Sequence, residues 1–531
     1  MKKKILLSTL ACALVGTPLR AEYLPVALLD TPSLPILANN LQSYLETARL
    51  VDNPDSAQAM LMRVFMLPDY YKAPHEPAVC HWIYDTGAGA MADGMRRVVV
   101  IPASDRGEAL VKQLRNLYGD VNVRPRDGFW ICTPAAGLPP LALFNRAGRM
   151  WISSDQKTLL WAALNEHALL PRPQESPGLP WFVAHPANLL AYLESPYVRT
   201  APLAPDEPLY WVRALGFAKP LLEAFQGIWL GVTLDRNAVG LDFRMHVKTF
   251  SEAGQWLTSW PNPGAKTEAY IPVQNTLALI TGIPDVVDSP PCFGTLGRGM
   301  KDFAMYVAET RAFGPYLAYV AEIQGDDADG LAGRLGREIT SLQLIPGTRV
   351  VPTRKRVPRQ GPEVYTFRLE STAPEGNLFS APLKAACSAL VGECWVQDRH
   401  IFATLAVAPA AETVIQQGAR RAAGLRSTTL DRVRRGLQKL PERIRFALVA
   451  SPSSMLRASM MRMPGADQAR LGAIPTVSDG FTLAIAEERY AFLRVYMRIN
   501  STEINTLREI FDRGQPVIRH AAGEIQKQGA K

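Results

Sequence analysis

The sequence predicts an α+β protein made of two tandem duplicated domains, each a mostly antiparallel sheet with helices packed on one face. Its composition, 47% apolar and 20% charged residues, is that of a globular chain. The 531 residues exceed one ordinary domain, so we expect two or more cores. The third observation is that strand and helix patterns of the first half recur, in the same order, in the second half.

The chain begins with the features of a Sec signal peptide. Lys2, Lys3 and Lys4 precede an apolar run from Ile5 to Gly16, which a small residue, Ala21, follows as the expected exit. We therefore expect residues 1–21 to be removed and the mature protein to be periplasmic or secreted. No later segment is apolar for the roughly 20 residues that a spanning helix needs, so we do not expect a membrane-spanning protein.

Four segments of the first half have a counterpart in the second half. The clearest is a long hairpin, GIWLGVTLDRNAVGLDFRMHVK at 227–248 and GFTLAIAEERYAFLRVYMRIN at 480–500, with period-2 alternation on both sides of a polar turn. The other pairs are PVALLDTP (25–32) with TLALITGIP (276–284), VVVIPASDRGEALVKQL (98–114) with YVAEIQGDDADGLAGRL (319–335), and FVAHPANLL (182–190) with LVASPSSML (448–456). These matches predict repeat domains at 22–262 and 263–520, followed by a polar tail at 521–531.

Local patterns give further elements. Helices are expected to bury an apolar stripe such as Leu331, Leu335 and Ile339. Ser153 and Asp155 are expected to form the N-cap of a helix over 155–166. The glycine-rich loop 294–299 is expected to lead into a helix over 299–311.

Motifs that carry catalysis or bind cofactors are not recognisable in the sequence. The seven histidines are scattered without metal-ligand spacing, and neither a phosphate-binding loop nor G-x-S-x-G occurs. Ser154 and Lys157 satisfy S-x-x-K, but the companion motifs of that chemistry are missing. We identify no catalytic residue, metal site or cofactor, and a binding protein is favoured over an enzyme. A pair of glycosidase carboxylates remains an alternative, because its members can lie far apart in the sequence.

Two groups of residues are candidates for ligand binding. Nine of the ten tryptophans lie in the first half, and their flat apolar rings suit a sugar or an apolar cleft; the candidates are Trp82, Trp130 and Trp151. Basic residues gather at 349–360 and 419–439, where an anionic glycan, lipid or polymer is the expected partner; the candidates are Arg354, Lys355, Arg356 and Arg359. Export and the lack of interleaved aromatic residues argue against nucleic acid.

The net charge and the cysteine content give little information about function. The formal charge is +9, and the four positive charges of the predicted signal peptide leave +5 in the mature chain. Five cysteines follow the signal peptide. Cys387 and Cys394 are close enough in sequence to form a disulfide if the chain turns between them, whereas Cys80 and Cys132 lie in apolar runs that favour buried free thiols.

With its signal peptide, its PVALLDTP and TLALITGIP openings, its GRMWISSDQKTLL segment and its terminal hairpins, the chain resembles uncharacterised exported proteins of Gram-negative bacteria of the Planctomycetes and Verrucomicrobia type. This resemblance implies no activity. We expect a non-enzymatic envelope or secreted protein, a binding or scaffold module that uses the cleft between its two duplicated domains. The alternatives are a secreted glycan-acting hydrolase with a tryptophan-rich site in the first half, and a protein that binds anionic lipid or polymer.

Overall fold

The computed structural model describes residues 23–513 except for short gaps at 51–55, 68–76, 90–91, 104–106, 127, 134–139, 172–179, 201–218, 235–236, 273–274, 285–291, 311–313, 325–327, 346, 358–360, 373–386, 422–432, 434–442, 462–467, 475–476, 478 and 490. The predicted signal peptide and the predicted polar tail lie outside the described residues. The described strands pair in antiparallel fashion and are accompanied by helices, which confirms the α+β class.

The chain divides into two compact units. The first comprises Met1–Asn39 and Asp55–Trp229, and the second comprises Asn40–Pro54 and Leu230–Lys531. The division therefore falls inside strand β9 (Phe225–Leu234), whereas the sequence places the repeat boundary at 262/263. The hairpin that ends the first sequence repeat belongs mostly to the second compact unit. The repeat boundary itself stays a prediction.

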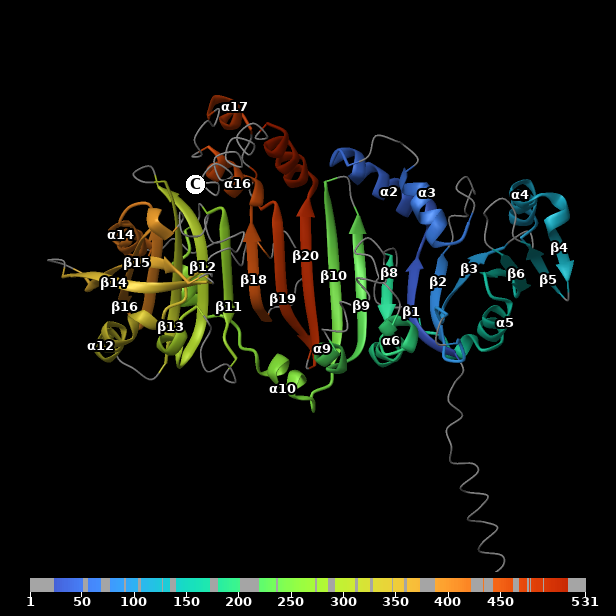
Figure 1. Ribbon diagram of the computed structural model, residues 1–531, viewed down its shortest axis with the longest axis horizontal. Coiled ribbons are helices and arrows are strands. Elements are labelled where there is room, and N and C mark those ends of the chain that lie inside the picture. The colour runs from blue at the N-terminus through green and yellow to red at the C-terminus, as the bar shows by residue number, and fades with distance from the viewer. Residues whose placement is uncertain are drawn as a thin grey trace, which may run out of the picture. The chain divides into compact units, whose positions relative to one another are not determined.

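The first unit contains an eight-stranded antiparallel sheet (Figure 1). In spatial order its strands are β8 (Trp181–Ala184), β1 (Tyr23–Thr31), β2 (Ala78–Asp85), β3 (Met95–Pro102), β7 (Arg149–Ser153), β6 (Leu141–Arg146), β5 (Phe129–Cys132) and β4 (Val123–Arg126). Its helices include α3 (Ser56–Val64), α4 (Glu108–Tyr118), α5 (Gln156–Leu164), α6 (Pro186–Leu193), α7 (Pro196–Thr200) and α9 (Lys219–Glu223), and α2 (Leu34–Thr47) has residues in both units.

The second unit continues from β9 through eleven further antiparallel strands. In spatial order these are β10 (Ala238–Val247), β20 (Phe492–Asn500), β19 (Phe481–Arg489), β18 (Arg443–Ala450), β11 (Leu277–Gly282), β12 (Met300–Thr310), β13 (Gly314–Ile323), β17 (His400–Ala406), β16 (Val391–Gln397), β15 (Val364–Ser371) and β14 (Thr348–Arg356). Its helices include α10 (Glu252–Ser259), α11 (Ala265–Ala269), α12 (Ala328–Glu338), α14 (Ala411–Arg421), α16 (Pro452–Met460), α17 (Gln468–Gly472) and a helix over 501–513.

The strand order β8-β1-β2-β3-β7-β6-β5-β4 of the first unit recurs in the second unit as β18-β11-β12-β13-β17-β16-β15-β14. The hairpins β6–β7 and β16–β17 also share a two-residue turn. Both central residues have positive φ, Ala147 (52°) and Gly148 (73°) in the first and Asp398 (49°) and Arg399 (64°) in the second. Positive φ at both positions is what a type I′ hairpin turn requires. These two hairpins therefore align residue by residue.

The hairpins β9–β10 and β19–β20 meet through β10 and β20, which pair over their whole length. In the sequence repeat Leu241 corresponds to Leu493 and Met245 to Met497. The observed partners are Phe243 with Val495, Leu241 with Met497, and Met245 with Leu493. Leu241 thus lies opposite the counterpart of Met245, and Met245 lies opposite the counterpart of Leu241. This reciprocal pairing is that of two hairpins related by a local twofold axis.

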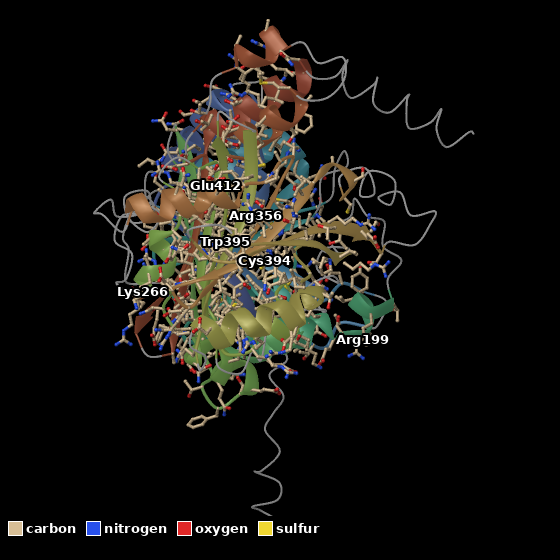
Figure 2. All side chains as sticks on the ribbon, turned by 90° about the vertical axis from the view of Figure 1, so that its left-hand side faces the viewer. Arg199, Lys266, Arg356, Cys394, Trp395 and Glu412 are labelled. Atoms are coloured by element: carbon tan, nitrogen blue, oxygen red, sulfur yellow. The ribbon has the colours of Figure 1, made fainter. Side chains whose placement is uncertain are left out.

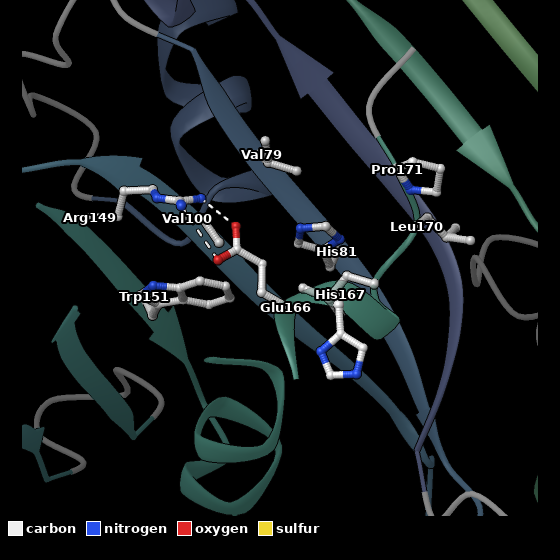
Figure 3. Close-up of a pocket in the computed structure, with 10 residues that line it drawn as sticks. Val79, His81, Val100, Arg149, Trp151, Glu166, His167, Leu170 and Pro171 are labelled. Atoms are coloured by element: carbon white, nitrogen blue, oxygen red, sulfur yellow. Dashed lines mark hydrogen bonds and ion pairs between the residues drawn. The ribbon is translucent and has the colours of Figure 1, made fainter. Parts of the chain in front are cut away.

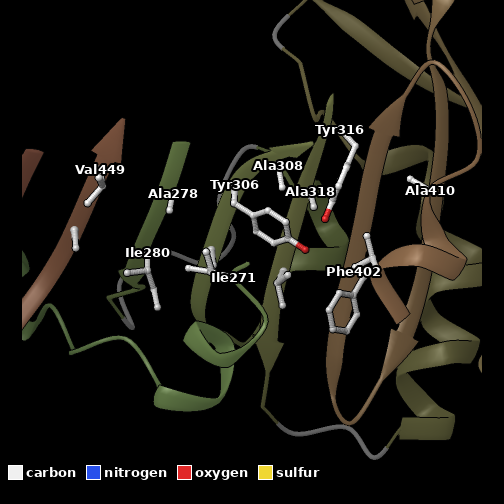
Figure 4. Packing of buried hydrophobic residues seen from close by; sticks show 14 of the residues in the cluster. Ile271, Ala278, Ile280, Tyr306, Ala308, Tyr316, Ala318, Phe402, Ala410 and Val449 are labelled. Carbon is white, nitrogen blue, oxygen red and sulfur yellow. The ribbon is translucent and has the colours of Figure 1, made fainter. Parts of the chain in front are cut away.

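Helices cover both faces of the sheets, so the prediction of helices on one face is wrong. In β3, Val99 packs in a cluster with α4, whereas Val98 and Val100 pack in another with α5. The same division occurs in the second unit, where α14 packs on the face of Tyr306 and Phe402 (Figure 4) and α12 packs on the opposite face. Near-continuous apolar runs such as VVVI in β3 signal burial on both faces.

Two local predictions have opposite outcomes. The predicted cap is confirmed, because Asp155 Oδ2 accepts a hydrogen bond of 2.7 Å from the Thr158 backbone N–H at the start of α5. The helix predicted over 299–311 is wrong, because this segment forms β12. Alternate residues of β12 face opposite sides: Asp302, Ala304 and Tyr306 are buried, and the residues between them are partly buried.

The cysteines after the signal peptide are free thiols in the structure. Cys387 and Cys394 are both free, so the predicted disulfide between them is not formed. Both belong to the apolar cluster around α12, and Figure 2 labels Cys394. In this setting each thiol packs as a small apolar side chain. Cys80 and Cys132 are buried free thiols, as predicted. Within the described part of the chain, helices long and apolar enough to span a membrane do not occur.

Candidate functional site

A pocket of about 280 Å³ opens on one face of the first unit's sheet (Figure 3). Its lining residues are Val79, His81, Val100, Arg149, Trp151, Glu166, His167, Leu169, Leu170 and Pro171. Strand register explains the floor, since Val79 lies opposite Val100 and Val100 lies opposite Trp151. Cross-strand partners point to the same face, so these three side chains form one apolar row across β2, β3 and β7.

An ion pair forms the polar wall of the pocket. Arg149 follows the turn before β7, and its Nη1 lies 2.6 Å from Oε1 of Glu166, while its Nη2 lies 3.4 Å from Oε2. Glu166 lies in the short 3₁₀ turn Glu166–Ala168 that follows α5. Both side chains are about half exposed, so the pair adds little stability. Its charges cancel, and the wall offers a ligand both donors and acceptors without a net charge.

Two histidines complete the polar groups. His81 is buried on β2, two residues after Val79 and therefore on the same face, and His167 is exposed beside Glu166. A neutral imidazole offers one donor and one acceptor. The pocket thus combines an apolar floor with several hydrogen-bonding groups on one side, the usual composition of a small-molecule site.

The pocket contains few groups for covalent or acid–base chemistry. Glu166 is the only carboxylate among its ten described lining residues, whereas glycoside hydrolysis ordinarily needs two. Groups of three or more His, Cys, Asp or Glu side chains suited to hold a metal ion are not found among the residues that the structure describes. The arrangement is suited to binding.

The three candidate tryptophans do not come together. Trp151 lines the pocket, whereas Trp82 and Trp130 pack on the opposite face of the sheet, in the cluster with α4. Trp82 lies edge-on to Phe182 at 5.9 Å, and the guanidinium of Arg115 lies 5.2 Å from the Trp130 ring. Trp82 and Trp130 are therefore packing residues at the edge of the core. Of the three candidate tryptophans, only Trp151 lines the pocket.

Three of the four candidate basic residues, Arg354, Lys355 and Arg356, lie on β14, an edge strand of the second unit that is far along the chain from the pocket. Arg354 and Lys355 are exposed. Lys355 pairs with Glu363 at 2.6 Å, and Arg356 (Figure 2) lies 3.9 Å from Glu393. Charged side chains on an edge strand also prevent pairing with other chains. Arg359 and most of 419–439 lie outside the described residues.

His81, Arg149 and Glu166 are not among the binding candidates that the sequence predicts. The alternation in AVCHWIYD places Val79 and His81 on one face, which is the available signal. Their approach to Arg149 depends on the pairing of β3 with β7, which joins segments that no local pattern connects.

Comparisons with protein-family models, with curated proteins and with solved structures give no match for this chain. The resemblance to exported proteins of Gram-negative bacteria stays a prediction.

Proposed function

We propose that this chain is an exported, non-enzymatic envelope or secreted binding protein built by internal duplication, and that the pocket of its first unit binds a neutral, sugar-sized ligand. The observation that carries the proposal is the apolar row Val79–Val100–Trp151 beside the charge-balanced pair Arg149 and Glu166. Export is proposed from the signal-peptide pattern of residues 1–21.

A sugar ring suits this pocket for physical reasons. One face of a pyranose ring carries mainly C–H groups and rests well on an apolar floor, while its hydroxyls need donors and acceptors at the rim. The pair Arg149–Glu166 supplies both without excess charge, so an ionic ligand would bring an unbalanced charge into the pocket. A hexose of about 12 non-hydrogen atoms at about −0.3 kcal/mol each would bind with a dissociation constant in the millimolar range.

Three observations support the duplication. The strand order is repeated in the two units, the type I′ turns at Ala147–Gly148 and Asp398–Arg399 coincide, and the β10–β20 register is symmetric. The corresponding edge strands β4 and β14 also each carry a proline, Pro125 and Pro352, where a missing N–H is tolerated. Independent origin of all these features is a less economical explanation.

The two alternatives have less support. A glycan hydrolase would need a second carboxylate facing Glu166, and the described lining residues supply none. Binding of an anionic polymer would need unpaired basic groups, and on β14 the ion pairs of Lys355 and Arg356 already use part of the charge.

Isothermal titration with neutral mono- and disaccharides, supported by ligand-observed NMR, tests the proposal. We expect saturable millimolar binding to the mature chain. Glu166→Gln should weaken it about fivefold to tenfold, the loss of one charge-assisted hydrogen bond of about 1–1.4 kcal/mol. Glu412→Gln, an exposed change at the first turn of α14, is the matched control and should bind as the wild type does. If no sugar binds, or if Glu166→Gln binds equally well, the pocket is not the site.

A further inference from the structure

The second unit has a counterpart of the pocket floor, at positions that its equivalent strands define. Because the turns Ala147–Gly148 and Asp398–Arg399 coincide, Trp151 of β7 corresponds to Phe402 of β17. Strand register gives the rest of the row, which is Ala304, Val320 and Phe402 in place of Val79, Val100 and Trp151. Both rows are apolar, so the two floors can be compared directly.

In the second unit the chain itself covers this floor. Tyr270, which follows α11, packs against the cluster that contains the row, and its ring centroid lies 4.8 Å from that of Phe402 in an edge-to-face arrangement. Ile271 is buried in the same cluster (Figure 4). The place above the floor thus accommodates one six-membered ring. Because Tyr270 precedes β11, its counterpart in the first unit would precede β1, outside the described residues, and there the floor lines the pocket.

The apolar surface of the pocket continues to Trp229 of β9. A small cluster of the first unit contains Leu28, Val79 and Val183, and both Leu170 and Trp229 pack against it. Val79 and Leu170 also line the pocket (Figure 3), so the pocket and the cluster of Trp229 are continuous. The indole is partly exposed, and part of its surface is therefore accessible.

The indole of Trp229 is a feature of the first unit alone. Gly227 lies two residues before it on the same face, and a Cβ at Gly227 would clash with the indole, so the missing side chain leaves room for the ring. In the hairpin of the second unit Gly480 and Thr482 take these two positions. Thr482 is 4% exposed and lies opposite Val449 of the paired strand β18. The first unit thus has a large, partly exposed ring where the second has a small buried side chain.

We propose that the site takes two linked pyranose rings, one in the pocket and the next against the indole of Trp229, so that its ligand is a neutral disaccharide or a longer glycan. This inference rests on the proposed function and adds the length of the ligand to its class. A flat indole suits the C–H face of a second sugar ring as Trp151 suits the first. In the second unit Tyr270 covers the floor and Thr482 replaces the indole, so we expect one site per chain.

Isothermal titration of the mature chain with glucose, galactose and mannose, and with cellobiose, maltose, lactose and mannobiose, tests this. We expect one site per chain and, for at least one of these dimers, a dissociation constant about tenfold lower than those of its monomers. Trp229→Leu keeps an apolar side chain on the cluster but removes the flat ring, so the advantage of the dimer should fall to about twofold or less. Glu166→Gln should weaken monomers and dimers alike and so retain the advantage.

The matched control is Trp256→Leu, which replaces another partly buried tryptophan, in α10 of the second unit. This variant should keep the full advantage of the dimer. Saturation-transfer NMR on the wild-type chain gives a second measurement that needs no variant, because protons of both rings of the bound dimer should receive saturation.

The possible failures of the two proposals are distinct. The inference is overturned, and the proposed function stands, if monomers bind but no dimer binds more tightly, if Trp229→Leu keeps the advantage, or if only one ring of the dimer receives saturation. If neither monomers nor dimers bind, the proposed function fails and the inference fails with it.

Discussion

Replacing Asp242 by asparagine tests how the two long hairpins are held together. Asp242 lies on β10 and accepts hydrogen bonds from Arg494 of β20, from Nε at 2.7 Å and from Nη2 at 2.8 Å, and a third from Arg244 at 3.3 Å. The side chains of Asp242 and Arg494 are 7% and 9% exposed. Removing one charge of a buried pair typically costs about 3–5 kcal/mol. Asparagine keeps one acceptor oxygen, so we expect a loss near the lower end, about 3 kcal/mol.

Urea unfolding followed by circular dichroism measures this loss as a lower midpoint. Arg494→Met and the double variant complete a double-mutant cycle, in which we expect a coupling energy of at least about 1 kcal/mol. Glu370→Gln, which alters an exposed ion pair with Arg349 on β14 and β15, is the control and should leave the midpoint nearly unchanged. A loss below about 1 kcal/mol for Asp242→Asn, with no coupling, would refute the argument that this buried pair holds the hairpins together.

Three further predictions follow from the cores. Gly392→Ala places a Cβ against the ring of Phe367, which is 1% exposed, so overpacking should cost about 1–3 kcal/mol in thermal or urea unfolding. Glu393→Ala removes the acceptor of the Ala410 and Ala411 backbone N–H groups at the start of α14, at 2.6 and 2.7 Å, and should cost about 1–3 kcal/mol in the same assay. Burial raises the pKa of Cys80 to about 12 and of Cys132 to about 11, so the native thiols should resist a thiol reagent at pH 8. All five should react in denaturant, and a count of three would instead indicate the Cys387–Cys394 disulfide.

The parts of the fold that depend on local pattern were predictable. Period-2 alternation identified the hairpins β9–β10 and β19–β20, and the Asp155 cap located α5. The segment 299–311 was mistaken for a helix because it follows a glycine-rich loop, although its alternation is that of a strand. Helix coverage on both faces was missed because it depends on where connections cross the sheet, which the strand sequence signals only through continuous apolar runs.

The candidate site was predictable only in part, because register decides it. The large apolar ring of Trp151 makes it a candidate, but the sequence around Trp151 does not indicate that Val79 and Val100 lie in the same row. Trp229 illustrates the same limit, because its packing in the cluster of Val79 arises only in the folded chain.

The two units differ chemically at one equivalent position. Arg149 and His400 each begin the strand after a type I′ turn, and the next residues on that face are Trp151 and Phe402. The shared backbone explains why the sequence repeat consists mainly of packing residues. The side chain that differs forms a pocket wall with Glu166 in the first unit, whereas in the second unit it is a buried histidine packed against Tyr270.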